Sequence, residues 1–122
     1  MRNKRILHES NDTLWRINDV YTQLYVSETI WFTLPPNYPF VPPQLWVDGL
    51  PYTEVVYTQY TKIKHLEPRA WRPLLQDWSP CYTCYQVYTQ YTEYMNLLKS
   101  IELLEELPFD NLIMKNVATF LL

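Results

Sequence analysis

The sequence predicts an α+β domain in which an antiparallel sheet packs against a long helix. Three features indicate this class: alternating apolar and polar residues in the first third, a proline-rich corner between two of these stretches, and helical periodicity in the last third. With 122 residues, of which 48% are hydrophobic, the chain can bury one core but is too short for two domains. We therefore expect a single domain over residues 1–122.

Residues 13–48 are predicted to form a three-stranded antiparallel meander, after a short polar lead at residues 1–12 that forms a loop or at most one helical turn. Alternating apolar residues place the strands within residues 13–20, 29–34 and 44–47, with residues 21–28 as the first connection. Connections this short favour antiparallel neighbours.

The second and third strands carry aromatic residues on the face away from the predicted core. Trp31 and Trp46 alternate with Phe32 and Leu45 and so fall on the opposite face of the sheet. Large exposed apolar patches are uncommon on monomers, and aromatic residues are frequent interface anchors. Contact with a protein partner and incidental exposure both remain open for this face.

A proline-rich corner, Asn-Tyr-Pro-Phe-Val-Pro-Pro at residues 37–43, joins the last two strands. Each proline fixes its own φ and moves the preceding residue out of the α region. We expect a rigid extended corner in which Tyr38 and Phe40 are buried.

The second half divides into a long irregular segment at residues 49–80 and helices at residues 81–122. The segment contains several prolines and has no clean period, so we expect it to pack irregularly on the sheet. Thr83 and Gln86 fit a capping box at the start of the long helix, and Pro108 stops this helix. Apolar residues at spacings of about three and four follow the cap: Val87, Tyr91, Tyr94, Leu98 and Ile101. Asp110 is predicted to cap a further C-terminal helix.

The proline corner and a second motif, Asp-Trp-Ser-Pro-Cys-Tyr-Thr at residues 77–83, resemble the family of ubiquitin-conjugating enzymes and its inactive variants. The resemblance extends over residues 13–105 and implies a ubiquitin-conjugating-enzyme-like meander sheet packed on a long central helix. The family's long N-terminal helix has only residues 1–12 available here, so the resemblance implies a truncated one.

The catalytic residues of the family are missing at the matching positions. The family's cysteine lies about eight residues before the tryptophan that matches Trp78, and this position is Ala70. The family's His-Pro-Asn motif would fall near residues 60–62, which read Tyr-Thr-Lys. A thioester needs a sulfur nucleophile. We therefore expect a catalytically inactive variant, not an enzyme, that needs no cofactor.

Protein partners are the expected ligands. Phe40, with Ser79, Pro80 and Cys81, matches the two loops that contact ligases in the family, and these residues join Trp31 and Trp46 as candidate partner-binding residues. One hypothesis is a scaffold subunit of a larger hetero-oligomeric complex, paired with another domain such as one of the same fold. The alternative is a variant that binds ubiquitin or assists an active conjugating enzyme.

The two cysteines, Cys81 and Cys84, also admit other chemistry. A Cys-x-x-Cys at a helix start is found in redox sites, and cysteines bind zinc when two further ligands are present, whereas His8 and His65 lack pair spacing. Cys81 could also act as a displaced nucleophile. We favour a structural interpretation, in which Cys81 replaces a small apolar residue and Cys84 packs in the core, with no metal site.

Composition excludes several other classes of function. A net charge of −3 with scattered basic residues argues against nucleic acid as a ligand. No apolar run approaches the ~18 residues of a membrane span, and the N-terminus does not lead into a secretory apolar stretch. A single glycine excludes a glycine-rich nucleotide loop. We expect an intracellular protein, in the cytoplasm or in an organelle such as the mitochondrion.

Overall fold

The computed structural model describes residues 2–63 and 74–106, which form an α+β fold with a five-stranded sheet. The elements follow one another as α1 (Arg2–Thr13), β1 (Arg16–Ile17), β2 (Gln23–Tyr25), β3 (Ile30–Thr33), β4 (Gln44–Val47), β5 (Leu50–Pro51), α2 (Tyr52–Thr61) and α3 (Cys84–Glu105). The α+β class predicted from the sequence is confirmed for this part of the chain.

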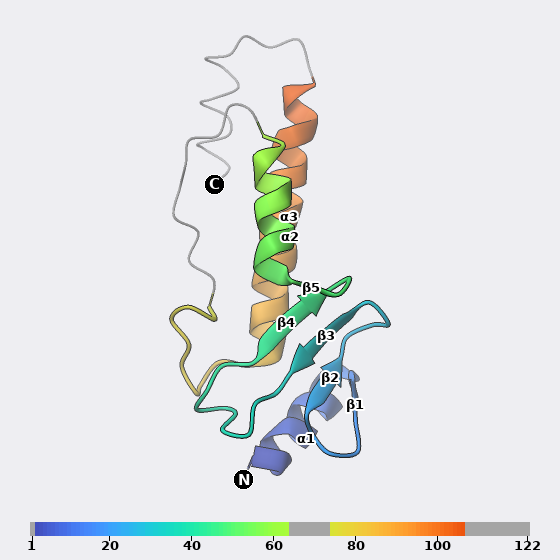
Figure 1. Ribbon diagram of the computed structural model, residues 1–122, viewed down its shortest axis with the longest axis vertical. Helices are drawn as coiled ribbons and strands as arrows, with labels where there is room; N and C mark the ends of the chain where they lie inside the picture. Colours follow the sequence, from blue (N-terminus) through green and yellow to red (C-terminus); the bar gives the residue numbers. More distant parts are fainter. Residues whose placement is uncertain (1, 64–73, 107–122) are drawn as a thin grey trace.

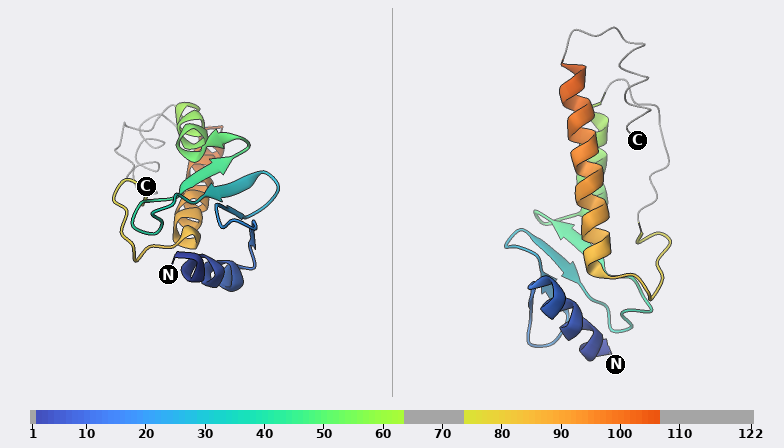
Figure 2. Two further views of the ribbon diagram at one scale, coloured as in Figure 1. Left: turned by 60° about the horizontal axis from the view of Figure 1, so that its bottom comes forward. Right: turned by 180° about the vertical axis from the view of Figure 1, so that it is seen from behind.

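The sheet is a meander with strand order β1-β2-β3-β4-β5, and every neighbouring pair is antiparallel. Figure 1 shows it in front of α1 and the first turns of α3, while α2 continues from β5 and runs beside α3. The view from behind in Figure 2 shows α1 and α3 in front of the sheet. One face of the sheet therefore carries α1 and α3. We call the opposite face, on which neither of these two helices lies, the helix-free face; α2 begins at its β5 edge and also contacts β4.

The prediction of three strands is wrong. The first part of the meander contains two strands, β1 and β2, where one strand followed by a connection was predicted. β1 has two residues, and β2 lies within the predicted connection at residues 21–28. Asn18 causes the early reversal: its Oδ1 accepts hydrogen bonds from the backbone N–H of Thr22 at 2.9 Å and of Gln23 at 3.0 Å. Such asparagine side chains stabilise turns locally.

Residues 1–12, which the local pattern predicted as a loop or at most one helical turn, form a 12-residue helix, α1, at the place where the resemblance implied a truncated N-terminal helix. The apolar face of this helix is small: among its apolar residues, only Ile6 is fully buried. Helices of this length are marginal in isolation and gain their stability from tertiary contacts. These contacts include the long-range hydrogen bonds of Arg2, Arg5 and Glu9, described below, which no local pattern indicates.

The irregular segment predicted at residues 49–80 contains β5 and the helix α2. Tyr52, Val56, Gln59 and Ile63 recur at helical spacing and are buried. Because Gln59 is polar, it interrupts the apolar spacing that would indicate a helix in the sequence. Its Nε2 donates a hydrogen bond to the Glu102 carboxylate of α3. Burial of the amide is therefore compensated by a partner that only the folded chain supplies.

The start of the long helix and the two residues of its capping box were predicted correctly. α3 begins at Cys84 after the N-cap Thr83, whose Oγ1 accepts from the backbone N–H of Gln86 at 3.2 Å, while the Gln86 Oε1 accepts from the Thr83 N–H at 2.9 Å. The helix ends at Glu105. Pro108 and the further helix predicted from Asp110 lie outside the described residues.

The core lies between α3 and the sheet face that this helix covers. Fully buried side chains from the middle strands, Leu24, Phe32 and Leu45, share one cluster with Val87 and Leu98 of α3. A half-buried indole closes one side of this cluster: Trp15 stacks on Phe32 at 5.9 Å and meets the edge of Tyr88 at 5.5 Å between ring centroids.

A buried carboxylate, Glu9, joins α1, the proline corner and the start of α3. It is only 5% exposed. Its Oε1 accepts a hydrogen bond from the Cys84 backbone N–H at 2.8 Å, and its Oε2 accepts from the Tyr38 hydroxyl. Arg5 Nε lies 3.6 Å from Oε2. A negative charge at a helix N-terminus also interacts favourably with the helix dipole.

Replacement of Glu9 by alanine is expected to lower the free energy of unfolding by about 3 kcal/mol, because two buried donors, the Cys84 N–H and the Tyr38 hydroxyl, lose their acceptor. Urea denaturation followed by circular dichroism measures this loss. Glu93→Ala, on the exposed side of α3, is the control and should shift the value by less than about 0.5 kcal/mol. Equal stability of the two variants would contradict the proposed role of Glu9.

A second prediction concerns Leu14, which follows α1 with φ +62° and a side chain that is 90% exposed. Left-handed backbone costs an L-residue roughly 1–2 kcal/mol, and glycine relieves this cost at the end of a helix. We expect Leu14→Gly to raise the melting temperature by a few degrees. Leu14→Ala keeps the strain and should leave the melting temperature unchanged; a lower value for the glycine variant would refute the prediction.

Candidate functional site

The proline corner forms a tight turn that buries one aromatic ring and exposes the other. Backbone N–H groups of Phe40 and Val41 donate to the Asn37 carbonyl at 2.8 and 3.1 Å, so the corner is folded and not extended as predicted. Tyr38 is 1% exposed, as expected, whereas Phe40 is 71% exposed. The prediction that both rings are buried is therefore wrong for Phe40, which the turn presents to solvent.

Trp78 holds the loop before α3 against the corner. Its Nε1 donates to the Pro39 carbonyl at 2.6 Å, and its ring lies 6.2 Å from that of Tyr38 and 5.8 Å from that of Tyr82. The two motifs that were recognised separately in the sequence thus contact each other directly. The contact brings the loop of Ser79, Pro80 and Cys81 beside Phe40's turn.

Two arginines of α1 complete this arrangement, and the sequence analysis missed both. Arg2 donates from Nε to the Pro35 carbonyl at 3.1 Å and from Nη2 to the carbonyls of Tyr21 and Leu34 at 2.7 and 3.2 Å. Arg5 donates to the carbonyls of Pro80, at 2.6 Å, and Tyr82. The rigid fork of a guanidinium suits several such bonds at once. Nothing in the local sequence signals carbonyl partners this distant.

A surface pocket of about 410 Å³ opens between these groups. Its walls are Arg2, Arg5, Pro36, Asn37, Tyr38, Pro39, Phe40 and Pro80; we call it the corner pocket. Two of the predicted partner-binding residues, Phe40 and Pro80, therefore line one pocket. Ser79 is half-buried, and its Oγ accepts from the Cys81 N–H at 3.3 Å; Cys81 is exposed next to the pocket and does not line it.

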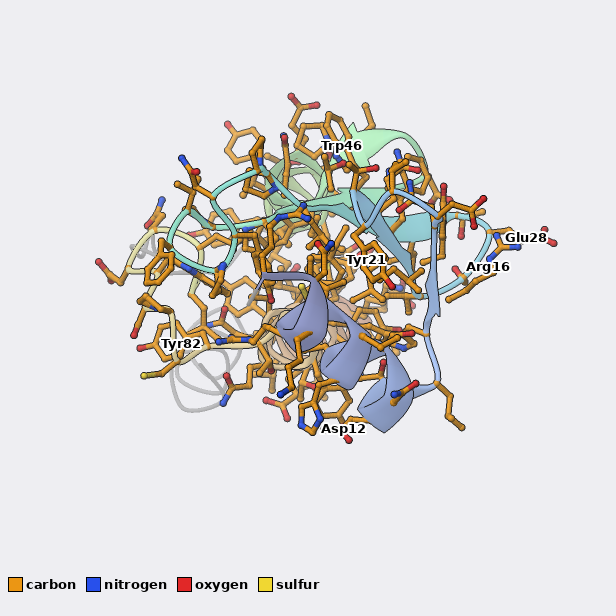
Figure 3. The ribbon with its side chains drawn as sticks, turned by 90° about the horizontal axis from the view of Figure 1, so that it is seen from below. Asp12, Arg16, Tyr21, Glu28, Trp46 and Tyr82 are labelled. Carbon is orange, nitrogen blue, oxygen red and sulfur yellow. The ribbon has the colours of Figure 1, made fainter. Side chains whose placement is uncertain are left out.

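The remaining two predicted residues lie on a different surface. Trp31 and Trp46 are paired across β3 and β4 on the helix-free face, both half-buried, while Phe32 and Leu45 are fully buried on the other side. Figure 3 shows Trp46 on the opposite side of the sheet from α1 and far from Tyr82 of the loop before α3. The six predicted residues thus belong to two surfaces, the corner pocket with its adjoining loop and the helix-free face.

The two cysteines differ sharply in their surroundings. Cys84 is fully buried, with its Sγ 3.6 Å from the Tyr38 hydroxyl, as the structural interpretation predicted. Burial, together with the charge of Glu9, raises the pKa of the Cys84 thiol well above its ordinary value of 9.0. Cys81 is exposed, and neither cysteine forms a disulfide. The thiolate needed for redox or metal chemistry is therefore disfavoured at Cys84.

The remaining predictions concern the position of the His-Pro-Asn motif, metal ligands and membrane spans. Residues 60–62, where the resemblance would place the His-Pro-Asn motif, end helix α2 and include its C-cap Lys62. Ala70 and His65 lie outside the described residues. Within residues 2–63 and 74–106, no group of three or more His, Cys, Asp and Glu side chains could hold a metal ion. Over the same ranges, no helix combines the length and apolarity that crossing a membrane requires.

No family model, curated protein or solved structure matches this chain.

The cysteine environments predict selective alkylation. In the native protein at pH 8, iodoacetamide should modify Cys81 readily and Cys84 at least about a hundredfold more slowly, since Cys84 reacts only after the chain opens. Mass spectrometry of the intact chain over time measures both rates. In urea the two rates should become similar, and Cys81→Ser should remove the fast reaction. Fast native modification of Cys84 would mean that its thiol is accessible and would revive the redox interpretation.

Proposed function

We propose that this protein is a non-catalytic, ubiquitin-conjugating-enzyme-like subunit that acts as a scaffold within a larger complex through contact with other folded domains, such as one of the same fold. The observation that carries this proposal is the aromatic surface on the helix-free face, where Trp31 and Trp46 are neighbours. Both rings are half-buried, so each leaves part of its surface accessible, and aromatic side chains bind partners at little cost in side-chain entropy.

Three features support the absence of thioester chemistry. The position that corresponds to the family's catalytic cysteine is Ala70. Of the two cysteines in the chain, Cys84 is fully buried at the start of α3, and burial raises the pKa of its thiol, which opposes a nucleophilic thiolate. Cys81 follows Trp78, whereas the family's nucleophile precedes the corresponding tryptophan.

The corner pocket favours a second candidate function. Phe40 and Pro80, from the two loops that resemble ligase-contacting loops, line the same pocket, with Cys81 exposed beside them. A chain that kept this surface while losing catalysis would serve as a variant that binds ubiquitin or assists an active conjugating enzyme. This alternative uses the corner pocket, and the scaffold proposal uses the helix-free face, so substitutions separate them.

Native purification of the tagged full-length chain, analysed by size and mass spectrometry, tests both functions. The scaffold proposal predicts a large stable complex without ubiquitin machinery, which is lost on Trp46→Ala and retained on Phe40→Ala. Tyr57→Ala is the matched control, because Tyr57 is an exposed aromatic residue of α2 (69%) outside both surfaces. Recovery of ubiquitin or a conjugating enzyme, lost on Phe40→Ala, would instead establish the alternative. Recovery of the chain alone would contradict both.

A further inference from the structure

The corner pocket combines apolar walls with positive charge. Its apolar surface comes from three prolines and from the ring of Phe40, which is 71% exposed. The guanidinium groups of Arg2 and Arg5 line the same pocket, and among the described residues no Asp or Glu does. Its volume of about 410 Å³ is within the range of ligand pockets, roughly 300–1,000 Å³.

The positive charge of this pocket is only partly compensated. Arg5 Nε lies 3.6 Å from the Glu9 carboxylate. Arg2 forms no ion pair with a carboxylate in residues 2–63 and 74–106. Its hydrogen bonds go to neutral acceptors: the carbonyls of Tyr21, Leu34 and Pro35, and Asn3 Oδ1. These bonds fix the guanidinium in position and leave its charge in place, in a chain whose net charge is −3.

Asn37 adds an unused amide to the walls. It is exposed, and its backbone carbonyl accepts the hydrogen bonds that close the turn. Its side chain has no hydrogen-bond partner within the described part of the chain. A side-chain amide can donate to a carboxylate and accept from a peptide N–H. The pocket thus offers apolar surface, positive charge and a polar group side by side.

A neighbouring pocket of about 470 Å³ lacks this charge imbalance. It shares Arg5 with the corner pocket, but its walls also include His8, Glu9 and Asp12. His8 and Asp12 are paired with each other at 3.1 Å. Charges of both signs therefore compensate each other there, and the corner pocket is the one of the two that favours an anionic ligand.

We propose that the corner pocket binds an acidic segment of a partner protein, in which a carboxylate lies next to an apolar side chain. The carboxylate meets Arg2 and the Asn37 amide, and the apolar side chain packs on Phe40 and Pro80. Charge complementarity selects the partner, and packing on the exposed ring supplies affinity. The inference goes beyond both proposed functions, because it assigns the chemistry of the ligand and depends neither on ubiquitin machinery nor on the helix-free face.

Fluorescence anisotropy tests the proposal with a defined probe, the fluorescein-labelled peptide Gly-Asp-Glu-Phe-Leu-Asp-Glu-Gly. The full-length chain is titrated up to about 1 mM, the weak end of specific binding. We expect saturable binding that weakens as the salt concentration rises from about 50 to 500 mM. No binding of this peptide overturns the proposal.

Two control peptides carry the same label. One has Asn and Gln in place of Asp and Glu, and the other has Ser in place of Phe and Leu. Both should bind at least about fivefold more weakly, since the first lacks the negative charges and the second lacks the apolar side chains. Equal binding of the three peptides overturns the proposal.

Substitutions of Asn37 change the charge of the pocket at one exposed position. Asn37→Asp keeps the shape of the side chain and suits a turn equally well. It should weaken binding of the acidic peptide at least about threefold, and Asn37→Lys should strengthen it. Asn96→Asp, on the exposed surface of α3, is the matched control and should have no effect. Circular dichroism establishes that each variant is folded, and equal affinities for Asn37→Asp and Asn37→Lys overturn the proposal.

Side-chain signals of the ¹⁵N-labelled chain locate the bound peptide. The Asn37 amide signal, identified by its loss in Asn37→Asp, should shift as the acidic peptide is added. The indole N–H of Trp46, which donates to Thr33 on the helix-free face, should not shift. A peptide that shifts the Trp46 signal and leaves that of Asn37 unchanged is bound elsewhere and overturns the proposal.

The outcomes also separate this inference from the proposed functions. Absence of peptide binding, with a larger complex that is lost on Trp46→Ala, overturns the acidic ligand and leaves the scaffold function standing. Peptide binding that responds to Asn37 as expected, in a chain that native purification recovers alone, supports this inference and contradicts both proposed functions.

Discussion

The buried carboxylate of Glu9 is the interaction on which the described structure depends. Three elements that are distant in the sequence meet at its two oxygens: Cys84 at the start of α3, Tyr38 of the proline corner and Arg5 of α1 itself. A buried charge is costly unless hydrogen bonds and an opposite charge compensate it. The three partners must therefore be in place together, and the position of α1 follows from theirs.

The geometry of the corner pocket is a consequence of this arrangement. With α1 held by Glu9, Arg5 reaches the carbonyls of Pro80 and Tyr82, and Trp78 closes the loop against Pro39. These bonds set the loop before α3 against the corner. The helix-free face does not depend on these bonds, because strand register pairs Trp31 with Trp46, and Trp46 Nε1 donates to the Thr33 hydroxyl within the face. The two surfaces are thus held in place by separate sets of contacts.

The candidate site could be predicted from the sequence only in part. Alternation along single strands was enough to place Trp31 and Trp46 on one face, and motif resemblance was enough to select Phe40 and Pro80. Tyr25, which is paired with Trp31 on the adjacent strand, was missed, because the register between strands decides which residues are neighbours and no single strand reveals it. The arginines of the corner pocket were missed because their acceptors are backbone carbonyls more than 15 positions away in the sequence.

The sequence by itself determined the elements whose signals are local. The capping box and apolar spacing of α3, and the strands β3 and β4, come from residues within a few positions of one another. The local pattern of residues did not indicate α1 or α2, and an N-terminal helix was expected only from the resemblance. Both helices bury polar residues, Glu9 and Gln59, whose partners lie on other elements. A polar residue at a core position weakens the helical pattern, and only the distant partner that compensates its burial makes the position favourable.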